Sequence, residues 1–345
     1  MLQLKTHRLV IDEKKTVSLH ASTLLPLEDG RVLAAWFGGS GEGRCDTGIW
    51  LAEKNGNLFS APRVVANGML PHWNPVLYRF DDGRIALFYK VGLKISHWKT
   101  MVIESFDGGR TFSEPRELVP GDTSGGRGPV RNKPIRLRSG RVLAPASTEQ
   151  GLWRCFVDIS DDDGHTWRKS SMIEIPGLEE YERKLLEWMK LSEESEAPIE
   201  RPAELRHGRG IIQPTLWESE TGVHALMRSG EGFIYRSDST DDGQTWSAPY
   251  PTSLPNNNSG IDLTQLPDGT LLLVYNPVQV SWGLRSPISI AQSTDNGETW
   301  TKLCDLQCEP GEFSYPAIVN VGNTVHITYT YKRENIAYWQ FVHYD

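Results

Sequence analysis

The sequence predicts an all-β fold, a six-bladed β-propeller, from three observations. The first is a turn motif, S-x-D-x-G-x-T-(W/F), which we call the Asp box; its four copies start at Ser105, Ser160, Ser239 and Ser293. The second is a series of six predicted hairpins that recur roughly every 50 residues. The third is that only one segment carries helical periodicity. Repeated short strands with almost no helix are typical of a closed ring of small sheets.

Each predicted hairpin consists of two strand-like runs on either side of a tight turn that contains glycine. The turn glycines are Gly30, Gly83, Gly140, Gly222, Gly269 and Gly322. Alternating apolar residues around such turns are the strongest short-range signal for a β-hairpin. A further strand-like run follows each hairpin, and in four units it leads into an Asp box. Each unit therefore supplies about four strands, and six units make the ring.

The two ends of the chain are also strand-like. The segment LQLKTHRLVI begins at Leu2, and the segment NIAYWQFVH begins at Asn335. We expect these two segments to pair within one blade and to close the ring, because closure removes exposed sheet edges. Residues 1–345 are then expected to form a single domain.

The Asp boxes are expected to be structural. Their Asp can accept hydrogen bonds from amides of the turn, their Gly supplies a positive φ angle, and their aromatic residue fills the gap between strands. The DDDG segment that begins at Asp161 lacks the later ligand positions and the terminal Glu of an EF-hand calcium loop. We therefore expect neither catalysis nor calcium at these turns.

One long step between units, about residues 177–208, predicts a short helical insertion. Its apolar residues recur at helical spacing: Leu178, Tyr181, Leu185, Leu186 and Met189. Two roles are open for this insertion. It is either a decoration on the outside of the ring or a lid beside the central pocket.

Composition restricts the partners of the chain. Its formal charge of −8 argues against nucleic acid or an anionic membrane surface as the main partner. No run of 18 apolar residues predicts a membrane span, and the charged N-terminal segment does not resemble a secretory signal, so we expect a cytoplasmic protein. The pair Cys304 and Cys308 has no neighbouring Cys or His to complete a zinc site. We expect no metal and no cofactor, and the sequence leaves the oligomeric state open.

Polar side chains stand at the start of the first strand in all six predicted blades. In a propeller this strand lines the central channel, so the six starts converge. The polar residues there are His20, His72 with Asn74, Arg131 with Asn132 and Lys133, Gln213, Asn258 with Asp262, and Tyr315. Packing alone does not require polar groups at the head of an apolar strand in every unit. We therefore expect a ligand site at this end of the channel.

With these motifs the chain resembles the sialidase (neuraminidase) superfamily, whose members are six-bladed propellers that carry Asp boxes. The resemblance covers essentially the whole chain apart from the helical insertion. It implies an exo-glycosidase that hydrolyses a terminal acidic sugar from a glycan. In that family arginines bind the sugar carboxylate, a Tyr activated by a Glu is the nucleophile, and an Asp is the acid and base.

The resemblance implies roles for four residues of this chain. Arg228 in ALMRSG and Arg285 after YNP would bind the carboxylate. Tyr315 in FSYPAI would be the nucleophile. Asp46 in GEGRCDTG would be the acid and base, with Glu42 as a nearby competitor.

Two positions depart from the family pattern. His20 takes the place of the first arginine, and Gln213 stands where the activating Glu is expected. Since Gln does not accept a proton under ordinary conditions, Glu312 and Glu149 are the candidates to replace that Glu. The other polar residues near the strand starts are expected to contact the substrate: Asn74, Arg131, Lys133 and Asp262.

Two other functions remain open. A polysaccharide lyase on uronate-containing glycans would use arginines to neutralise the carboxylate, and His72, His20 or Tyr315 as base and acid. A non-catalytic propeller that binds a glycan or a protein is compatible with the replacement of the first arginine by His20 and of the activating Glu by Gln213.

Overall fold

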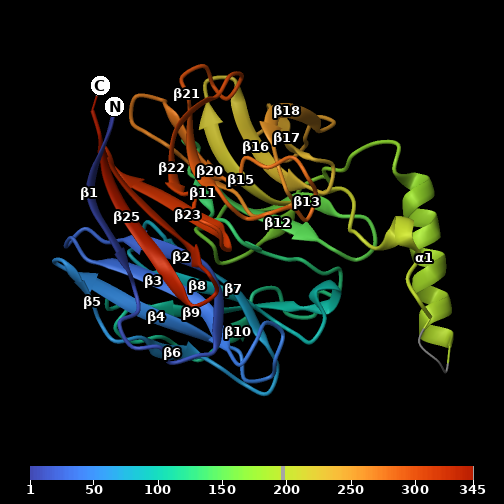
Figure 1. The fold of residues 1–345 in the computed structure, drawn as a ribbon, viewed down its shortest axis with the longest axis horizontal. Coiled ribbons are helices and arrows are strands. Elements are labelled where there is room, and N and C mark those ends of the chain that lie inside the picture. The colour runs from blue at the N-terminus through green and yellow to red at the C-terminus, as the bar shows by residue number, and fades with distance from the viewer. Residues whose placement is uncertain (196–198, 345) are drawn as a thin grey trace.

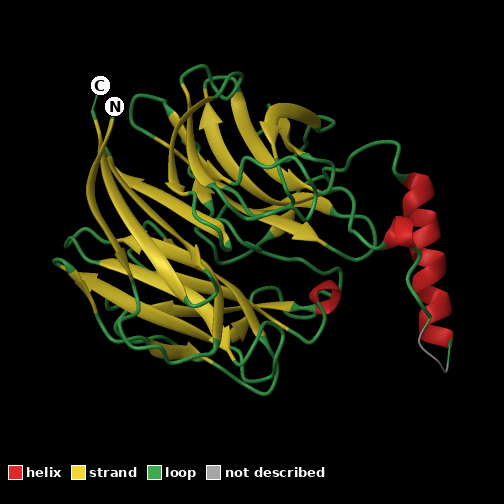
Figure 2. Cartoon of the chain, viewed as in Figure 1, coloured by secondary structure: helices red, strands yellow, loops and turns green. Residues whose placement is uncertain are grey.

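The computed structural model describes residues 1–195 and 199–344, and these residues form six antiparallel sheets (Figure 1). Five of the described sheets have four strands, and the sixth has five. Strands dominate the molecule, and the long helix lies at its margin (Figure 2). The six-bladed all-β propeller that the sequence predicts is confirmed.

The blades follow one another along the chain, and in each the first strand is the innermost. Blade 1 consists of β2 (Ser18–Pro26), β3 (Val32–Gly39), β4 (Gly48–Asn55), β5 (Leu58–Phe59) and β6 (Arg63–Ala66). Blade 2 consists of β7 (His72–Arg79), β8 (Ile85–Val91), β9 (Lys99–Ser105) and β10 (Arg116–Glu117). Blade 3 consists of β11 (Ile135–Arg136), β12 (Val142–Thr148), β13 (Arg154–Ser160) and β14 (Arg168–Lys169).

The second half of the ring repeats this order. Blade 4 consists of β15 (Ile211–Ser219), β16 (Gly222–Ser229), β17 (Phe233–Ser239) and β18 (Tyr250–Pro255). Blade 5 consists of β19 (Asp262–Gln265), β20 (Leu271–Tyr275), β21 (Ile288–Ser293) and β22 (Thr301–Gln307). Blade 6 consists of β23 (Phe313–Val321), β24 (Thr324–Tyr331), β25 (Asn335–His343) and the N-terminal β1 (Leu2–Leu9).

Blade 6 joins the two ends of the chain. β1 pairs antiparallel with β25, so that Leu2 lies opposite His343 and Leu9 lies opposite Ala337. The two termini consequently lie side by side (Figure 1). The predicted pairing of the opening and closing segments is confirmed.

The hydrophobic core of the described ring is divided into clusters that lie between consecutive blades. Phe37 of blade 1 and Leu87 of blade 2 share one cluster, and Tyr338 of blade 6 and Trp36 of blade 1 share another. Clusters of the same kind join blades 2 and 3, 3 and 4, 4 and 5, and 5 and 6. Because every blade buries apolar residues against both neighbours, the ring fixes where the inner strands begin.

Each Asp box is closed by its own side chains. In the copy that starts at Ser239, the Asp241 carboxylate accepts hydrogen bonds from Ser239 Oγ at 2.8 Å and from Thr245 Oγ1 at 2.6 Å. The glycine position of the box does not tolerate a side chain. Gly164 has a φ of 85°, and an added Cβ would lie 2.3 Å from the Phe80 ring of the preceding blade. The turns have the hydrogen bonds that a structural role requires.

An arginine of the preceding blade fastens each Asp box to its neighbour. Each arginine donates to a main-chain oxygen of the box: Arg31 to Gly108 at 3.2 Å, Arg84 to Asp163 at 2.7 Å, Arg141 to Asp242 at 3.1 Å, and Arg236 to Asn296 at 2.9 Å. The same four arginines also form ion pairs with carboxylates. These arginines therefore belong to the scaffold.

The predicted helical insertion contains α1 (Glu179–Glu194), and short 3-10 turns occur at η1 (Ile95–His97) and η2 (Ala203–Leu205). Leu178, Tyr181 and Leu185 pack against Leu152 of blade 3. Arg154 of β13 donates to both oxygens of Glu182, each at 2.6 Å. The helix is thus fixed to blade 3. Within the described ranges, no helix has the length and apolar character needed to cross a membrane.

Candidate functional site

Four inner strands carry a strained residue near the end of the channel where they begin, and a fifth strained residue, Asn258, precedes β19. These described non-glycine residues have positive φ angles: Ala21 at 55°, Asn74 at 42°, Gln213 at 54°, Asn258 at 62° and Tyr315 at 53°. Such angles cost roughly 1–3 kcal/mol each and gather at functional sites. In four blades the strand register also shifts at this position. Repeated strain at one end of the channel marks it as the candidate site.

Tyr315 lies in a cluster of guanidinium groups at this end. The Cζ atoms of Arg131, Arg228 and Arg285 lie 5.4, 5.4 and 5.5 Å from the centre of its ring. Arg228 Nη1 donates to the phenolic oxygen at 2.7 Å. Arg131 donates to the main-chain oxygens of Tyr315 and Pro316. The structure therefore brings together Arg228, Arg285 and Tyr315 as the sequence predicts, while their roles towards a substrate stay predictions.

Arg228 is buried, and its described partners are all neutral. Its guanidinium donates to Tyr315 Oη, to Gln213 Oε1 at 3.1 Å and to Asn258 Oδ1 at 3.2 Å. Its Nη2 takes part in no hydrogen bond with a described residue, although this atom is not fully buried. One nitrogen of this cation therefore remains available to a ligand.

Arg131 is buried as well, and it has no ion-pair partner among the described residues. Its Nε and Nη1 lack hydrogen-bond partners. Burial lowers the pKa of Arg131 to about 10, although the charge of Asp262 opposes the shift. A buried cation without an adjacent anion is costly, since it loses its hydration without compensation. Arg131 and Arg228 together favour an anionic ligand at Tyr315.

The other buried arginines of the described chain are different. Arg31, Arg84 and Arg236 each form ion pairs with acidic side chains of their own blades or of neighbouring blades. All three are scaffold arginines that fasten an Asp box. The two buried arginines without an ion pair both contact Tyr315.

Arg285 shares a carboxylate with Arg333. The Glu312 carboxylate accepts from Arg285 Nη1 at 2.6 Å and from Arg333 Nε at 2.9 Å. Arg333 also pairs with Glu42. Glu312 is therefore bound to arginines, and no hydrogen bond among the described residues joins it to the Tyr315 phenol. Its predicted catalytic role stays a prediction.

His20 lies against the Tyr315 ring, with 4.1 Å between ring centres. Burial holds the pKa of His20 well below its usual value, and the charges of Arg333, Arg285, Arg131 and Arg228 lower it further. The imidazole is consequently neutral at neutral pH. Its Nδ1 is buried without a hydrogen-bond partner. The place that the resemblance gives to a first arginine thus holds a neutral ring.

Lys133 and Asp262 bind one another further along the channel. Lys133 Nζ lies 3.0 Å from Asp262 Oδ2 and donates to the Leu263 oxygen at 2.7 Å. Asp262 also accepts from Thr215 Oγ1 at 2.8 Å and from the Ile318 amide at 2.9 Å. Their predicted contact with a substrate is untested, and each already has its partners within the protein.

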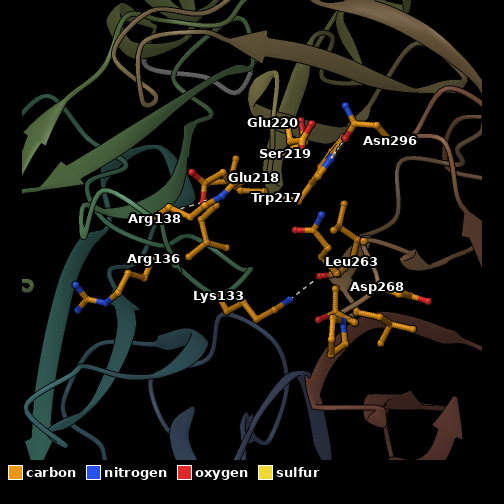
Figure 3. Close-up of a pocket in the computed structure, with 17 residues that line it drawn as sticks. Lys133, Arg136, Arg138, Trp217, Glu218, Ser219, Glu220, Leu263, Asp268 and Asn296 are labelled. Atoms are coloured by element: carbon orange, nitrogen blue, oxygen red, sulfur yellow. Dashed lines mark hydrogen bonds and ion pairs between the residues drawn. The ribbon is translucent and has the colours of Figure 1, made fainter.

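A cavity of about 680 Å³ occupies the opposite end of the channel, where the inner strands of blades 3, 4 and 5 end (Figure 3). We call it the hairpin-end cavity. Figure 3 shows Lys133 at one side of it, and Arg138 beside Glu218. Two more of its polar groups are paired: Arg136 with Asp81 and Asp163, and Trp217 Nε1 with Asn296. Despite its size, this cavity has fewer signs of a ligand site than the Tyr315 end.

Comparison with known proteins identifies the family. A model described as a BNR repeat-like domain matches residues 30–327. The chain belongs to this family. No curated protein sequence matches it.

Solved structures share the fold of this BNR repeat-like protein. A protein of unknown function from Dyadobacter fermentans has a TM-score of 0.75 at 16% identity, with 99% of both chains covered. The Hadza microbial sialidase Hz136 has a TM-score of 0.72 at 16% identity, over 94% of this chain and 66% of that one. The intramolecular trans-sialidase from Ruminococcus gnavus has a TM-score of 0.68 at 13% identity, over 97% of both chains. The resemblance to the sialidase superfamily is confirmed for the fold.

Three predicted site residues of the BNR repeat-like protein form no hydrogen bond or ion pair with Tyr315 in the described ranges. Asp46, in the β3–β4 loop, is exposed and accepts from Ser40 N at 3.0 Å and Ser40 Oγ at 2.9 Å. His72 Nδ1 donates to the Leu70 oxygen at 2.8 Å, and burial lowers the pKa of this imidazole. Asn74 is buried. No contact among the described residues joins these three to Tyr315, so their roles stay predictions.

Glu149 connects the cluster to a second cavity. Burial raises the pKa of the Glu149 carboxyl, and the nearby charge of Arg228 partly opposes the shift. Glu149 lines a cavity of about 520 Å³ that is bordered by α1, which we call the insertion cavity. The sequence suggested Glu149 only as a base for Tyr315. A carboxyl that holds its proton to higher pH than an ordinary Glu is suited instead to act as an acid.

Arg333 was not predicted from the sequence. It lies between β24 and β25, away from the starts of the inner strands where the sequence predicts the site. The described ranges contain no group of three or more His, Cys, Asp or Glu side chains arranged to hold an ion.

Proposed function

We propose that this BNR repeat-like protein hydrolyses the bond between a terminal acidic sugar and the rest of a glycan. The observation that carries this proposal is the pair of buried arginines without an ion-pair partner beside Tyr315. An acidic sugar supplies the missing anion. Arg228 Nη2 and Arg285 would hold its carboxylate, because a guanidinium group matches two carboxylate oxygens. The fold shared with sialidases supports the same class of substrate.

Tyr315 would then be the nucleophile. Its oxygen would lose its proton to the neutral imidazole of His20, which lies against the Tyr315 ring, and would form a bond to the anomeric carbon while the bond to the leaving oxygen breaks. Water would later release the sugar, and the phenolic oxygen would regain a proton. A Tyr suits this site, since a carboxylate nucleophile would be repelled by the carboxylate of the substrate. Gln213 does not accept the phenolic proton, but it accepts a hydrogen bond from Arg228 and so orients the guanidinium that holds the phenol.

Two carboxyl groups are candidates for the acid that protonates the leaving oxygen. The resemblance favours Asp46, and the raised pKa favours Glu149. Asp46→Asn and Glu149→Gln distinguish them. Loss of the acid should strongly slow the cleavage of substrates whose leaving group is a basic alcohol, because an alkoxide needs a proton as it departs. It should have little effect on the cleavage of substrates whose leaving group is an acidic phenol.

His20 favours a second function, β-elimination on a uronate-containing glycan. A neutral imidazole beside a phenol, within a cluster of arginines, provides a base, an acid and cations that would stabilise the carbanion next to the carboxylate. In this reaction one group removes the C5 proton and the other protonates the leaving oxygen.

The products decide between these functions. The protein is incubated with sialosides and with uronic-acid glycosides, and the masses of the released sugars are measured by mass spectrometry. Hydrolysis adds one water, whereas elimination gives an unsaturated sugar that absorbs in the ultraviolet. We expect a hydrated acidic monosaccharide. Release of no sugar from any acidic glycan contradicts both reactions and leaves a binding function.

A further inference from the structure

We propose that the insertion cavity binds the sugar ring to which the terminal acidic sugar is attached. This proposal rests on the proposed function, because it assigns the leaving part of the same substrate. The cavity lies between α1 and the ring, and its volume of about 520 Å³ is in the range of small-ligand sites.

The position of the cavity places it beside the point of cleavage. Trp282 lines it and donates from its amide to the Asn257 oxygen at 3.0 Å, and the next residue, Asn258, accepts from Arg228 Nε at 3.2 Å. Glu149, which also lines the cavity, lies near enough to Arg228 for the two charges to interact. Arg228 in turn donates to the Tyr315 oxygen at 2.7 Å. A glycan whose acidic sugar lies against Tyr315 would therefore continue past Glu149 into this cavity.

The lining of the cavity suits a sugar ring. Indole rings come from three separate parts of the chain: Trp153 of blade 3, Trp188 of α1 and Trp282 of the β20–β21 loop. Flat aromatic faces pack against the C–H faces of a pyranose, and an indole N–H can donate to a hydroxyl group. Trp188 Nε1 is buried and has no hydrogen-bond partner among the described residues, and the Arg201 guanidinium lies 5.1 Å from the centre of the ring. This N–H is thus a donor that a sugar hydroxyl can satisfy.

The walls of the cavity are held in place without a ligand. Trp153 packs on Gly208, where an added Cβ would lie 2.1 Å from the indole Cζ2. On the other side α1 is fixed by the packing of Leu185 and by the Arg154 to Glu182 ion pair. A preformed wall reduces the entropy lost on binding. The insertion is therefore a part of the substrate site rather than a decoration.

Ligand-observed NMR tests the cavity directly on the intact protein, with lactose, N-acetyllactosamine and cellobiose as probes. We expect saturation transfer to at least one disaccharide and a loss of about tenfold in affinity in Trp188→Ala. Leu191→Ala is the matched control, since Leu191 lies on the same helix, is 57% exposed and does not line the cavity. Absence of transfer to all three probes overturns the proposal.

A second variant covers the possibility that Trp188→Ala disturbs α1, because Trp188 packs partly against the Leu185 cluster. Trp282 is 55% exposed, and Trp282→Ala removes an indole from the opposite wall without removing core packing. We expect this variant to lose affinity for the same disaccharide while its circular dichroism spectrum is unchanged. Unchanged binding in both Trp variants overturns the proposal.

Kinetics separate this proposal from the proposed function. Two substrates share N-acetylneuraminic acid, one as a methyl glycoside and one linked to lactose. We expect Trp188→Ala to raise KM about tenfold for the lactose-linked substrate and less than about twofold for the methyl glycoside. Equal effects on both contradict the cavity assignment. If the wild-type protein turns over neither substrate, this result counts against the proposed function. The NMR experiment then tests the cavity assignment by itself.

Discussion

The two ends of the central channel both carry charged side chains, but they differ in how those charges are paired. Towards the hairpin end, Lys133, which lines the cavity there, pairs with Asp262 at the start of β19, and Arg138 pairs with Glu218. At the Tyr315 end, Arg131 and Arg228 are buried with no carboxylate partner in the described chain. The hairpin-end cavity is the larger of the two described above, yet its cations Lys133, Arg136 and Arg138 are all paired with carboxylates of the protein. Unpaired buried charge, rather than cavity size or charge alone, therefore indicates the ligand site.

The largest effect is expected at the Tyr315 end. Tyr315→Phe removes only the phenolic oxygen, so kcat for an acidic glycoside should fall by roughly 10³-fold or more while the affinity for the free acidic sugar changes little. Steady-state kinetics and calorimetry measure the two quantities. Tyr331→Phe is the control, because this hydroxyl donates to Glu309 at 2.9 Å outside the cluster. A Tyr315→Phe protein with wild-type turnover would exclude Tyr315 as the nucleophile.

The next largest effect is expected on the free energy of unfolding, from a substitution towards the hairpin end of the channel. Lys133→Met leaves Asp262 buried without its cation, so the free energy of unfolding should fall by about 3 kcal/mol. Chemical denaturation measures this change. In the double variant Lys133→Met with Asp262→Leu, part of the loss should return, because no unpaired charge remains. An equal loss in the single and double variants would show that the two ends do not differ as described.

Arg228→Met should show the opposite behaviour. Its removal relieves the desolvation of an unpaired cation but leaves Gln213 and Asn258 without a donor. The free energy of unfolding should therefore change by less than about 1 kcal/mol. The affinity for an acidic monosaccharide should fall roughly 30-fold, equivalent to about 2 kcal/mol for a charged hydrogen bond. A large loss of stability with unchanged affinity would place Arg228 in the scaffold.

The smallest effect is expected in the pH dependence of the free energy of unfolding. The pKa of His20 in the folded protein lies well below 6.5, so this side chain takes up its proton at a higher pH in the unfolded chain than in the folded one. The free energy of unfolding should therefore fall as the pH falls below about 6.5. Each such His contributes at most about 1.4 kcal/mol per pH unit to this slope. His20→Gln should reduce the slope and alter ligand binding.

The control for the pH dependence is His326, which lies in blade 6. Burial lowers its pKa to about 4. His326→Gln should reduce the slope in the same window without any change in affinity for an acidic sugar. If both variants leave the slope of the unfolding free energy unaltered, His20 is not buried in its neutral form.

The ring was predictable because its signals are local. Each turn glycine, such as Gly83, and each Asp box requires its backbone conformation from a few neighbouring residues. The order of the blades then follows from chain order, and the pairing of β1 with β25 follows from the need to remove two exposed edges. None of these steps requires knowledge of a side chain far away in the sequence.

The site was less predictable because it depends on distant contacts. Tyr315 was found from its place in the repeat and Arg228 from the family resemblance, but the ion pair of Arg333 with Glu42 joins blades 6 and 1 only after the ring has closed. The raised pKa of Glu149 arises from burial beside the insertion, which no local pattern records. Asp46 was placed by family resemblance alone, and the structure binds its carboxylate to Ser40.

The central claim is that the buried arginines beside Tyr315 hold the carboxylate of an acidic sugar. A crystal structure of the protein soaked with N-acetylneuraminic acid or glucuronic acid tests it most directly. We predict the sugar carboxylate within hydrogen-bond distance of Arg228 Nη2, with the ring against Tyr315. A sugar bound instead in the hairpin-end cavity, or bound beside Tyr315 with its carboxylate turned away from Arg228, would contradict the account.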